Sequence, residues 1–125
     1  MTDDKNPVNW FEIPVNDLSR AVRFYEAVFG LSLQKMEMGP AQMAMFPMVQ
    51  GGTNAGSALV KTDGYTPSHA GTVIYFSVAD IEGTLAKITG AGGSTIVPKM
   101  SIGEHGYFAQ FQDSEGNRVA LHSMS

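Results

Sequence analysis

The sequence contains no cysteine. Disulfide scaffolds, thiol catalysis and zinc or iron–sulfur sites held by cysteine are therefore excluded. Basic residues are scarce and scattered, and the formal net charge is -4, so neither a nucleic acid nor an anionic membrane surface is expected as a partner. No apolar run approaches the roughly 18 residues that a membrane-spanning helix requires.

The first residues, Met1 to Pro7, are polar and acidic and lack the apolar stretch of a secretory signal. A cytoplasmic location is therefore expected. Hydrophobic residues make up 43% of the 125 residues and charged residues 16%, which is an ordinary globular balance. A chain of this length can bury a core of its own, and a single domain over residues 1–125 is predicted.

An internal repeat organises the chain. When the first half is laid over the second, similar residues coincide, in the pairs Val15 and Val78, Asp17 and Asp80, and Gly30 and Gly93. Two copies of one supersecondary unit are the simplest interpretation. The first module is predicted at about residues 8–60 and the second at about 72–123. The polar segment 61–71, rich in turn-forming residues, is the expected linker.

Each module is predicted to open with an alternating strand, over 10–15 and 73–78, followed by a helix. Asp17 and Asp80 are suited to cap the helices, because a carboxylate accepts from the free N–H groups of the first turn. One apolar stripe marks the first helix, made of Leu18, Ala21, Val22, Tyr25, Val28 and Phe29. Three further strands are expected in each module, near 31–38, 42–48 and 55–60, and near 94–99, 106–112 and 118–123. The fold class predicted is α+β, with two βαβββ modules.

Two segments carry a resemblance to a known family. The first is residues 10–30, with Asp17, the Phe24–Tyr25 pair and the ending Gly30, and the second is the closing hairpin 111–121. Together they resemble the vicinal oxygen chelate superfamily, which includes glyoxalases, bleomycin-resistance proteins and ring-cleaving dioxygenases. The resemblance extends from about residue 8 to 122. It implies a curved mixed sheet with its helix on the convex face in each module, a cavity enclosed by the two modules, and a homodimer.

The alternation of side chains along the strands predicts which residues face that cavity. Phe11, Ile13 and Val15 are expected to pack on the helix, and Val119 and Leu121 to enter the core. The residues that then face the cavity are Trp10, Glu12, Pro14, Val73, Tyr75, Ser77, Arg118, Ala120 and His122.

Metal-dependent members of the family take ligands from the first and last strand of each module. The positions that match by motif are Trp10, Ala58, Val73 and Ala120. An indole N–H only donates, and Val and Ala have no lone pair to offer, so we expect neither the family's metal nor another cofactor. A displaced divalent ion stays open as an alternative. Its candidate donors are Glu12, Glu104, His105 and His122.

Glu12 and His122 are the candidate catalytic residues. A carboxylate within an apolar strand must face something polar, and it could act as a general base, while an imidazole could shuttle protons. Glu12 could instead pair with Arg118 or with a nearby hydroxyl, and His122 could simply be exposed near the end of the chain. The candidate ligand-binding residues are Trp10, Tyr75, Glu104, His105 and Arg118. Tyr75 could merely pack its ring, and the Glu104–His105 loop could merely be solvated.

Methionine is abundant, with 8 in the chain. Thioether side chains adapt to irregular shapes and suit the wall of a cavity for flat or hydrophobic ligands, although core packing explains the same pattern. The residues concerned are Met36, Met38, Met43, Met45, Met48 and Met100.

Three functions remain open on this basis. The first is a small-molecule binder that needs no metal. The second is a lyase, isomerase or dioxygenase that uses Glu12 or a displaced metal. The third is a non-catalytic interaction module, since one fold hosts many functions.

Overall fold

The structure, a computed structural model, describes residues 6–125, so the first five residues of the polar N-terminal segment lie outside the described part. The elements in chain order are β1 (Trp10–Pro14), α1 (Leu18–Phe29), β2 (Gln34–Met38), β3 (Ala41–Met45), β4 (Gly56–Lys61), β5 (Tyr75–Ser77), α2 (Ile81–Gly90), β6 (Ser94–Ser101), the 3-10 helix η1 (Gly103–His105), β7 (Tyr107–Gln112) and β8 (Arg118–Ser123).

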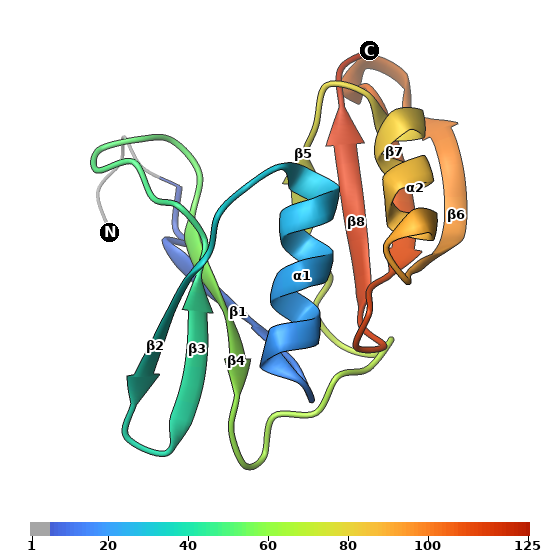
Figure 1. The fold of residues 1–125 in the computed structure, drawn as a ribbon. Coiled ribbons are helices and arrows are strands. Elements are labelled where there is room, and N and C mark those ends of the chain that lie inside the picture. The colour runs from blue at the N-terminus through green and yellow to red at the C-terminus, as the bar shows by residue number, and fades with distance from the viewer. Residues whose placement is uncertain (1–5) are drawn as a thin grey trace.

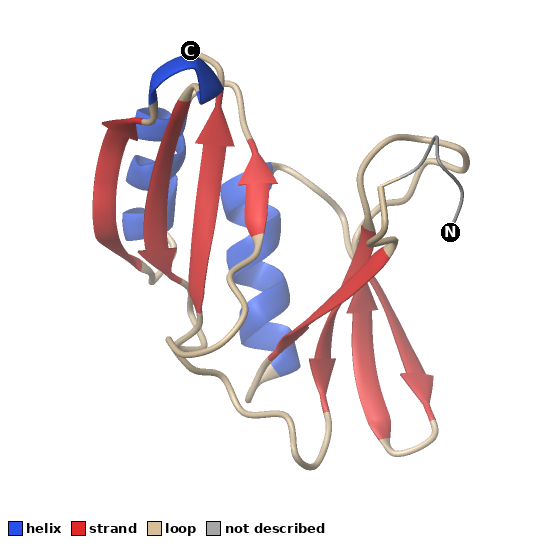
Figure 2. Cartoon of the chain, turned by 180° about the vertical axis from the view of Figure 1, so that it is seen from behind, coloured by secondary structure: helices blue, strands red, loops and turns tan. Residues whose placement is uncertain are grey.

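Two four-stranded sheets result. Sheet A has the order β1-β4-β3-β2 and sheet B the order β5-β8-β7-β6. In both sheets the first strand of the module pairs in parallel with the last, and the other pairs are antiparallel. The predicted α+β fold of two βαβββ modules is confirmed. Helix α1 lies between the two sheets and α2 lies over sheet B, which leaves one face of each sheet free of helices (Figure 1, Figure 2).

Helix α1 forms where the sequence predicts it. Asp17 caps its start, because its Oδ1 accepts from the backbone N–H of Arg20 at 3.0 Å. Gly30 ends the helix in a left-handed conformation with φ 65°, which glycine adopts without strain. The predicted apolar stripe faces inward, and Phe24, which the stripe did not include, is also buried.

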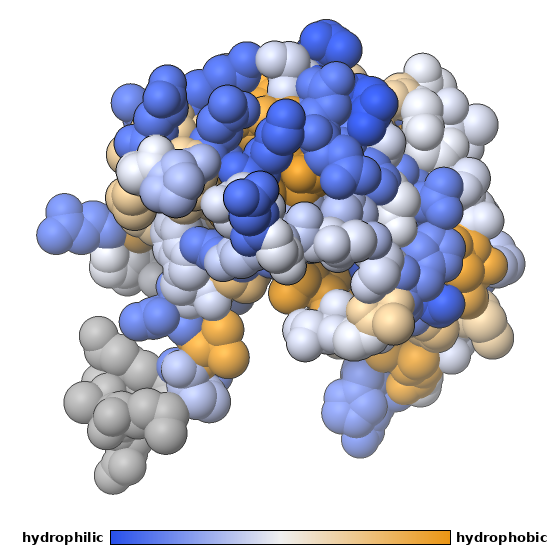
Figure 3. Space-filling view, turned by 90° about the horizontal axis from the view of Figure 1, so that it is seen from below, coloured by the Kyte–Doolittle hydropathy of each residue, from blue (hydrophilic) through white to orange (hydrophobic). Residues whose placement is uncertain are grey.

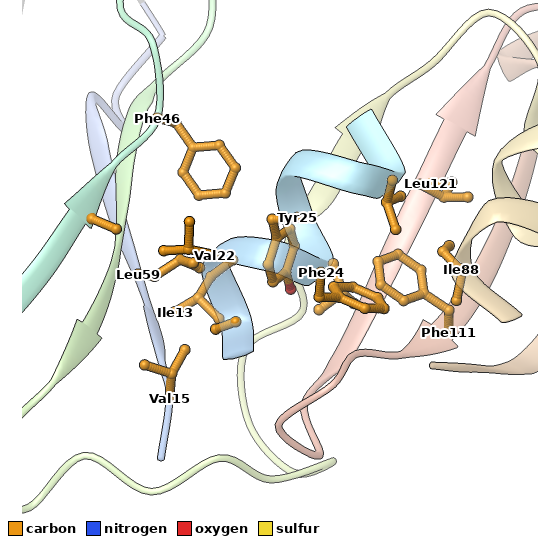
Figure 4. Close-up of a cluster of buried hydrophobic side chains, with 14 of the residues drawn as sticks. Ile13, Val15, Val22, Phe24, Tyr25, Phe46, Leu59, Ile88, Phe111 and Leu121 are labelled. Atoms are coloured by element: carbon orange, nitrogen blue, oxygen red, sulfur yellow. The ribbon is translucent and has the colours of Figure 1, made fainter. Parts of the chain in front are cut away.

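One continuous cluster of buried apolar side chains joins the two modules (Figure 4). Ile13, Leu59 and Phe46 enter it from module one, and Ile88, Phe111 and Leu121 from module two. The ring of Phe76 on β5 lies 4.6 Å from that of Phe29 and 5.7 Å from that of Phe46. The main core therefore belongs to both modules together.

The hairpin between β7 and β8 fastens module two onto module one. Asp113, 1% exposed, accepts from the Tyr25 hydroxyl at 2.7 Å and from the backbone of Glu115 and Asn117. Glu115 accepts from Arg20 Nε at 2.7 Å and from the backbone N–H groups at the start of α1. We call Asp113, Glu115 and Asn117 the hairpin latch. The sequence predicted the turn but not these contacts across the modules.

Several strand boundaries differ from the prediction. The strand expected from residue 31 begins at Gln34, because Leu31 and Leu33 pack against the core instead. The strand expected to reach Met48 ends at Met45, and Pro47, which has no N–H, follows soon after. The strand expected over 73–78 is limited to Tyr75–Ser77, so Val73 precedes it.

The methionines are mostly not part of the core. Met43 is buried, with an exposed fraction of 6%, as core packing would require. The explanation by core packing is wrong for four other methionines, which are exposed: Met36, Met38, Met48 and Met100. Those on β2 lie on an edge strand whose five residues are all exposed.

Candidate functional site

One face of each sheet carries no helix (Figure 2). Seen from below, hydrophilic side chains cover much of the surface, and apolar side chains show in patches between them (Figure 3). The predicted inward and outward faces are confirmed at the terminal strands, since Ile13, Val119 and Leu121 are buried in the core. The opposite faces therefore carry Trp10 and Glu12 on β1, and Arg118, Ala120 and His122 on β8.

The helix-free face of sheet A is an apolar wall. Its residues form a cluster separate from the core, made of Trp10, Ala41, Met43, Met45, Ala58 and Val60. Met36 pairs with Met43 across β2 and β3 and extends the wall to the exposed edge. Two features favour ligand contact here: the wall is apolar, and part of it is open to solvent.

Glu12 is the polar group on this wall. Its Oε1 accepts from the Tyr65 hydroxyl at 2.7 Å, and its Oε2 accepts from Trp10 Nε1 at 3.3 Å. The expected hydrogen bond to a hydroxyl is confirmed, whereas the expected alternative of a pair with Arg118 is not what the structure contains. The hydrogen bond to the Glu12 carboxylate raises the pKa of Tyr65.

Tyr65 is a site residue that sequence reasoning missed. It belongs to the linker, which has no periodic pattern, and it reaches β1 only through the fold. A tyrosine in a turn-rich segment was the one available signal.

His122 is held by a backbone group on sheet B. Its Nε2 lies 2.6 Å from the carbonyl oxygen of His105. A carbonyl only accepts, so Nε2 is the donor in this hydrogen bond. The side chains of Glu104 and His105 are 90% and 78% exposed, which agrees with the solvated interpretation of their loop.

Arg118 and Tyr75 also lie on the helix-free face of sheet B. Arg118 Nη1 donates to Gln110 Oε1 at 2.8 Å. Tyr75 stands opposite Ala120 across β5 and β8 and is 53% exposed, so its hydroxyl group is accessible to a ligand.

Hydrogen bonds join the predicted site residues into three separate groups within residues 6–125. Trp10 and Glu12 form one group with Tyr65, His122 forms another with His105, and Arg118 a third with Gln110. No set of three His, Asp or Glu side chains in the described part of the chain is close enough to hold a metal ion. The donors proposed for a displaced ion, Glu12, Glu104, His105 and His122, are therefore not assembled into one site.

A separate cleft of about 700 Å³ lies on the helix side of sheet A, at the start of α1. It contains none of the predicted site residues. Its lysines, Lys35 and Lys61, are accompanied by the carboxylates of Asp17 and Glu37, and Lys35 donates to Ser19 at 3.2 Å. Because its charges are mixed and its walls are mostly polar, this cleft shows no preference for one class of ligand.

Paired βαβββ modules define a class of small α+β domains. Residues 8–121 match the model of the Glyoxalase/Bleomycin resistance protein/Dioxygenase superfamily. The chain belongs to this superfamily.

Individual relatives agree. The chain is 30% identical over 117 residues to a glyoxylase-like domain-containing protein of Didymella fabae, covering 91% of both chains. Among solved structures, a glyoxylase/bleomycin resistance protein/dioxygenase domain from Frankia superposes with a TM-score of 0.73 at 16% identity, covering 94% of this chain and 97% of that one. Maize glyoxalase I superposes with a TM-score of 0.71 at 20% identity. The match covers 99% of this chain but 48% of the maize chain.

The metal that many members of the family bind does not fit the matching positions. Ala58 and Ala120 are fully buried methyl groups on the last strand of each module, Val73 precedes β5, and Trp10 directs its N–H to Glu12. None of these side chains offers an oxygen or nitrogen lone pair. We derive no chemical step through a metal at these positions.

None of the helices in residues 6–125 is long and apolar enough to cross a membrane. The cytoplasmic location stays a prediction.

Proposed function

We propose that the protein binds a small, largely apolar molecule on the apolar, helix-free face of sheet A, and that it does so without the family's metal. The observation that carries the proposal is the apolar wall of sheet A, with Trp10 and Met43 beside the exposed Met36. Exposed apolar surface is favourable to cover, and thioethers adapt to varied ligand shapes.

The single tryptophan makes the proposal directly testable. Trp10 lies on the wall, so energy transfer from its indole to a bound naphthylamine reports binding of the probe to this wall. The probe is N-phenyl-1-naphthylamine, which is flat, apolar and neutral. Saturable energy transfer is expected with the wild-type protein.

Met36→Lys places a charge on the wall and is expected to weaken probe binding at least about tenfold, since a lysine resists burial against an apolar ligand. Met124→Lys is the matched control, because Met124 is a 67% exposed methionine beyond the last strand. An absence of saturable binding to the wild type, or equal binding by both variants, would refute the proposal.

A second candidate function is proton transfer by Glu12. The favouring observation is its geometry, with Oε1 and Oε2 fixed by Tyr65 and Trp10 beside the apolar wall of sheet A. A carboxylate positioned in this way could remove a proton next to a carbonyl group, as in a lyase or isomerase.

Proton exchange would test this second function. The protein would be incubated in D2O with small oxo-compounds, and deuterium uptake beside the carbonyl group followed by NMR. Glu12→Gln should abolish any catalysed exchange, whereas Glu37→Gln, on exposed β2, should not. Exchange that survives in Glu12→Gln would remove Glu12 from the reaction.

We also propose a homodimer. Strand β2 pairs on one side only, and its exposed residues include Met36 and Met38, so a second copy could cover this edge. Sedimentation at two protein concentrations would test it. A monomer at tens of micromolar would contradict the proposal.

A further inference from the structure

We infer that the apolar wall of sheet A selects amines: its ligand is an apolar molecule that carries a positively charged ammonium group, and the carboxylate of Glu12 holds this group. The inference rests on the proposed binding function and adds the chemical class of the ligand. Each residue that it uses lies on the helix-free face of sheet A or is hydrogen-bonded to that face.

Glu12 lies in one row with residues of the apolar wall. It stands opposite Ala58 across β1 and β4, and Ala58 stands opposite Met45 across β4 and β3. Directly paired residues of neighbouring strands point to the same face of a sheet, so the three side chains share this face. The carboxylate is therefore next to the surface that an apolar ligand would cover.

The charge on this face is negative. Among the described residues, Glu12 is the one charged side chain that the strands of sheet A place on it. The strands carry three further charged residues, Lys35, Glu37 and Lys61, and all three line the cleft on the opposite, helix side. The strand pairing agrees, because Lys35 pairs with Ala44, which is buried in the core. An apolar ligand on the wall is thus best complemented by a cation.

The carboxylate of Glu12 has neutral hydrogen-bond partners. Its Oε1 accepts from the Tyr65 hydroxyl at 2.7 Å and its Oε2 from Trp10 Nε1 at 3.3 Å. In the part of the chain that the structure describes, no basic side chain lies within 4.0 Å of it. Each oxygen of an ionised carboxylate can accept more than one hydrogen bond, so both oxygens can still accept from an ammonium group. A charged donor also compensates a half-buried carboxylate better than a neutral one does.

Aromatic rings flank the carboxylate. The half-buried indole of Trp10 lies against Gly56, where a Cβ atom would be 3.3 Å from its Cε3. Tyr65 is 41% exposed and reaches Glu12 from the linker. The faces of aromatic rings attract cations, so rings beside a carboxylate add to the binding of an ammonium group. The site therefore combines a negative charge with aromatic and apolar surface, which suits an amine with an apolar body.

The experiment compares 4-phenylbutylamine, 4-phenyl-1-butanol and 4-phenylbutyrate, which share a phenyl ring and an unbranched chain and differ in the charge of the end group. Each displaces N-phenyl-1-naphthylamine from the wild-type protein at neutral pH and about 0.15 M salt, with energy transfer from Trp10 as the signal. The amine is expected to displace the probe at a concentration at least about fivefold lower than the alcohol, the upper range for a partly exposed ion pair. The acid should be the weakest competitor, because Glu12 repels it.

Glu12→Gln is expected to remove the preference for the amine by weakening the amine alone, with the alcohol and the probe changed less than about twofold. Glu37→Gln is the matched control, because it removes the same charge from the helix side of the same sheet. It should leave the preference intact.

The outcomes separate the two proposals. If the neutral probe does not bind the wild type, the binding function itself fails. If the probe binds but the three compounds displace it from the wild type equally, the binding function stands and the inference about amines is wrong. The same conclusion follows if Glu12→Gln retains the preference, or if Glu37→Gln loses it to the same extent.

A further variant decides if Glu12→Gln no longer binds the neutral probe. Tyr65→Phe frees Oε1 of Glu12 without removing its charge, so it should retain or strengthen the preference for the amine. A loss of the preference in Tyr65→Phe, with the probe still bound, would overturn the inference.

Discussion

The hydroxyl of Tyr25 shows how one polar atom can stabilise an apolar interior. Its ring is fully buried, and its hydroxyl donates to Asp113 Oδ2 at 2.7 Å. Burial, together with the negative charge of Asp113, raises the pKa of Tyr25 well above its usual value, so the hydroxyl stays a proton donor at any working pH. The carboxylate depends on this donor because the pair has little access to water.

Replacing Tyr25 by Phe is expected to lower the free energy of unfolding by about 1–3 kcal/mol, since Asp113 loses a buried donor. Urea denaturation at neutral pH measures the change. Tyr75→Phe is the control: its side chain is 53% exposed, and the change should stay within about 0.5 kcal/mol. Equal stability of both variants would show that the buried hydrogen bond contributes nothing net.

At the same scale, Glu12 illustrates what a residue type can and cannot predict. A carboxylate in an apolar strand required a polar partner, and two partners were named in advance. The hydroxyl that Glu12 binds belongs to Tyr65, a linker residue that the sequence analysis did not name, and Arg118, the partner that it did name, pairs with Gln110 instead. Burial energetics predict that a partner exists, but not which distant segment provides it.

At the scale of elements, the junction of α2 and β6 depends on a residue without a side chain. A Cβ at Gly93 would lie 2.4 Å from the carbonyl oxygen of Gln112 and 2.8 Å from Cγ2 of Ile88. Glycine is required at this position because the chain between α2 and β6 passes so close to sheet B that a Cβ atom has no room. The repeat made Gly93 the counterpart of Gly30, but the two glycines serve different needs: space in one case and positive φ in the other.

Gly93→Ala is expected to destabilise the protein by about 1–3 kcal/mol, as overpacking in a tight contact does. Gly90→Ala, three residues earlier, has open space at the Cβ position and should be neutral or stabilising by up to about 1 kcal/mol. Thermal unfolding of the two variants compares them directly. The reverse order of stability would contradict the close approach seen at Gly93.

The hairpin latch is the second element-scale feature, and Glu115 makes it sensitive to acid. Burial would raise the pKa of this carboxyl, but hydrogen bonds from Arg20 and from the backbone N–H groups of Asp17 and Asn16 outweigh it and hold the pKa below the usual 4.5. The unfolded chain then takes up the proton at a higher pH than the folded one. The stabilisation is complete above the usual value and is lost as the pH falls through the folded pKa.

Glu115→Gln should therefore lower the free energy of unfolding by about 1–3 kcal/mol at pH 7. The stability of this variant should also decrease less steeply than that of the wild type as the pH falls below about 4.5. Urea midpoints from pH 7 to pH 3 test this. Glu104→Gln, at a 90% exposed carboxylate, should reproduce the wild-type profile. If the urea midpoint of Glu115→Gln decreased with falling pH as steeply as that of the wild type, other groups would be responsible for the acid sensitivity.

At the scale of the whole molecule, aromatic side chains hold the modules together. Phe76 on β5 lies within 6.2 Å, between ring centroids, of Phe11, Tyr25, Phe29 and Phe46, all from module one. Because these rings are shared, the placement of sheet A, which carries the apolar wall, depends on the same cluster that stabilises the fold. A change in the core should therefore also alter ligand binding.

Phe76→Ala is expected to lower the free energy of unfolding by about 3–4 kcal/mol, because the two modules lose a shared aromatic contact. It should also weaken binding of N-phenyl-1-naphthylamine. Phe108→Ala removes the same ring from the helix-free face of sheet B, opposite His122, and should cost less than half as much. Denaturation and probe titration on the same samples measure both effects. Equal losses would contradict a special role for the contact between modules.

The sequence by itself determined the two modules, the two capped helices, the inward and outward faces of the terminal strands, and the absence of ligands at the family's metal positions. These properties depend on residues near one another in the chain, through alternation, helical periodicity and capping. Only the tertiary structure decided that Tyr65 binds Glu12, that the hairpin latch joins the modules, that most methionines are exposed, and that the donors for a displaced ion stay apart. Each of these depends on contacts between segments far apart in sequence, and no local sequence pattern specifies which distant side chain makes the contact.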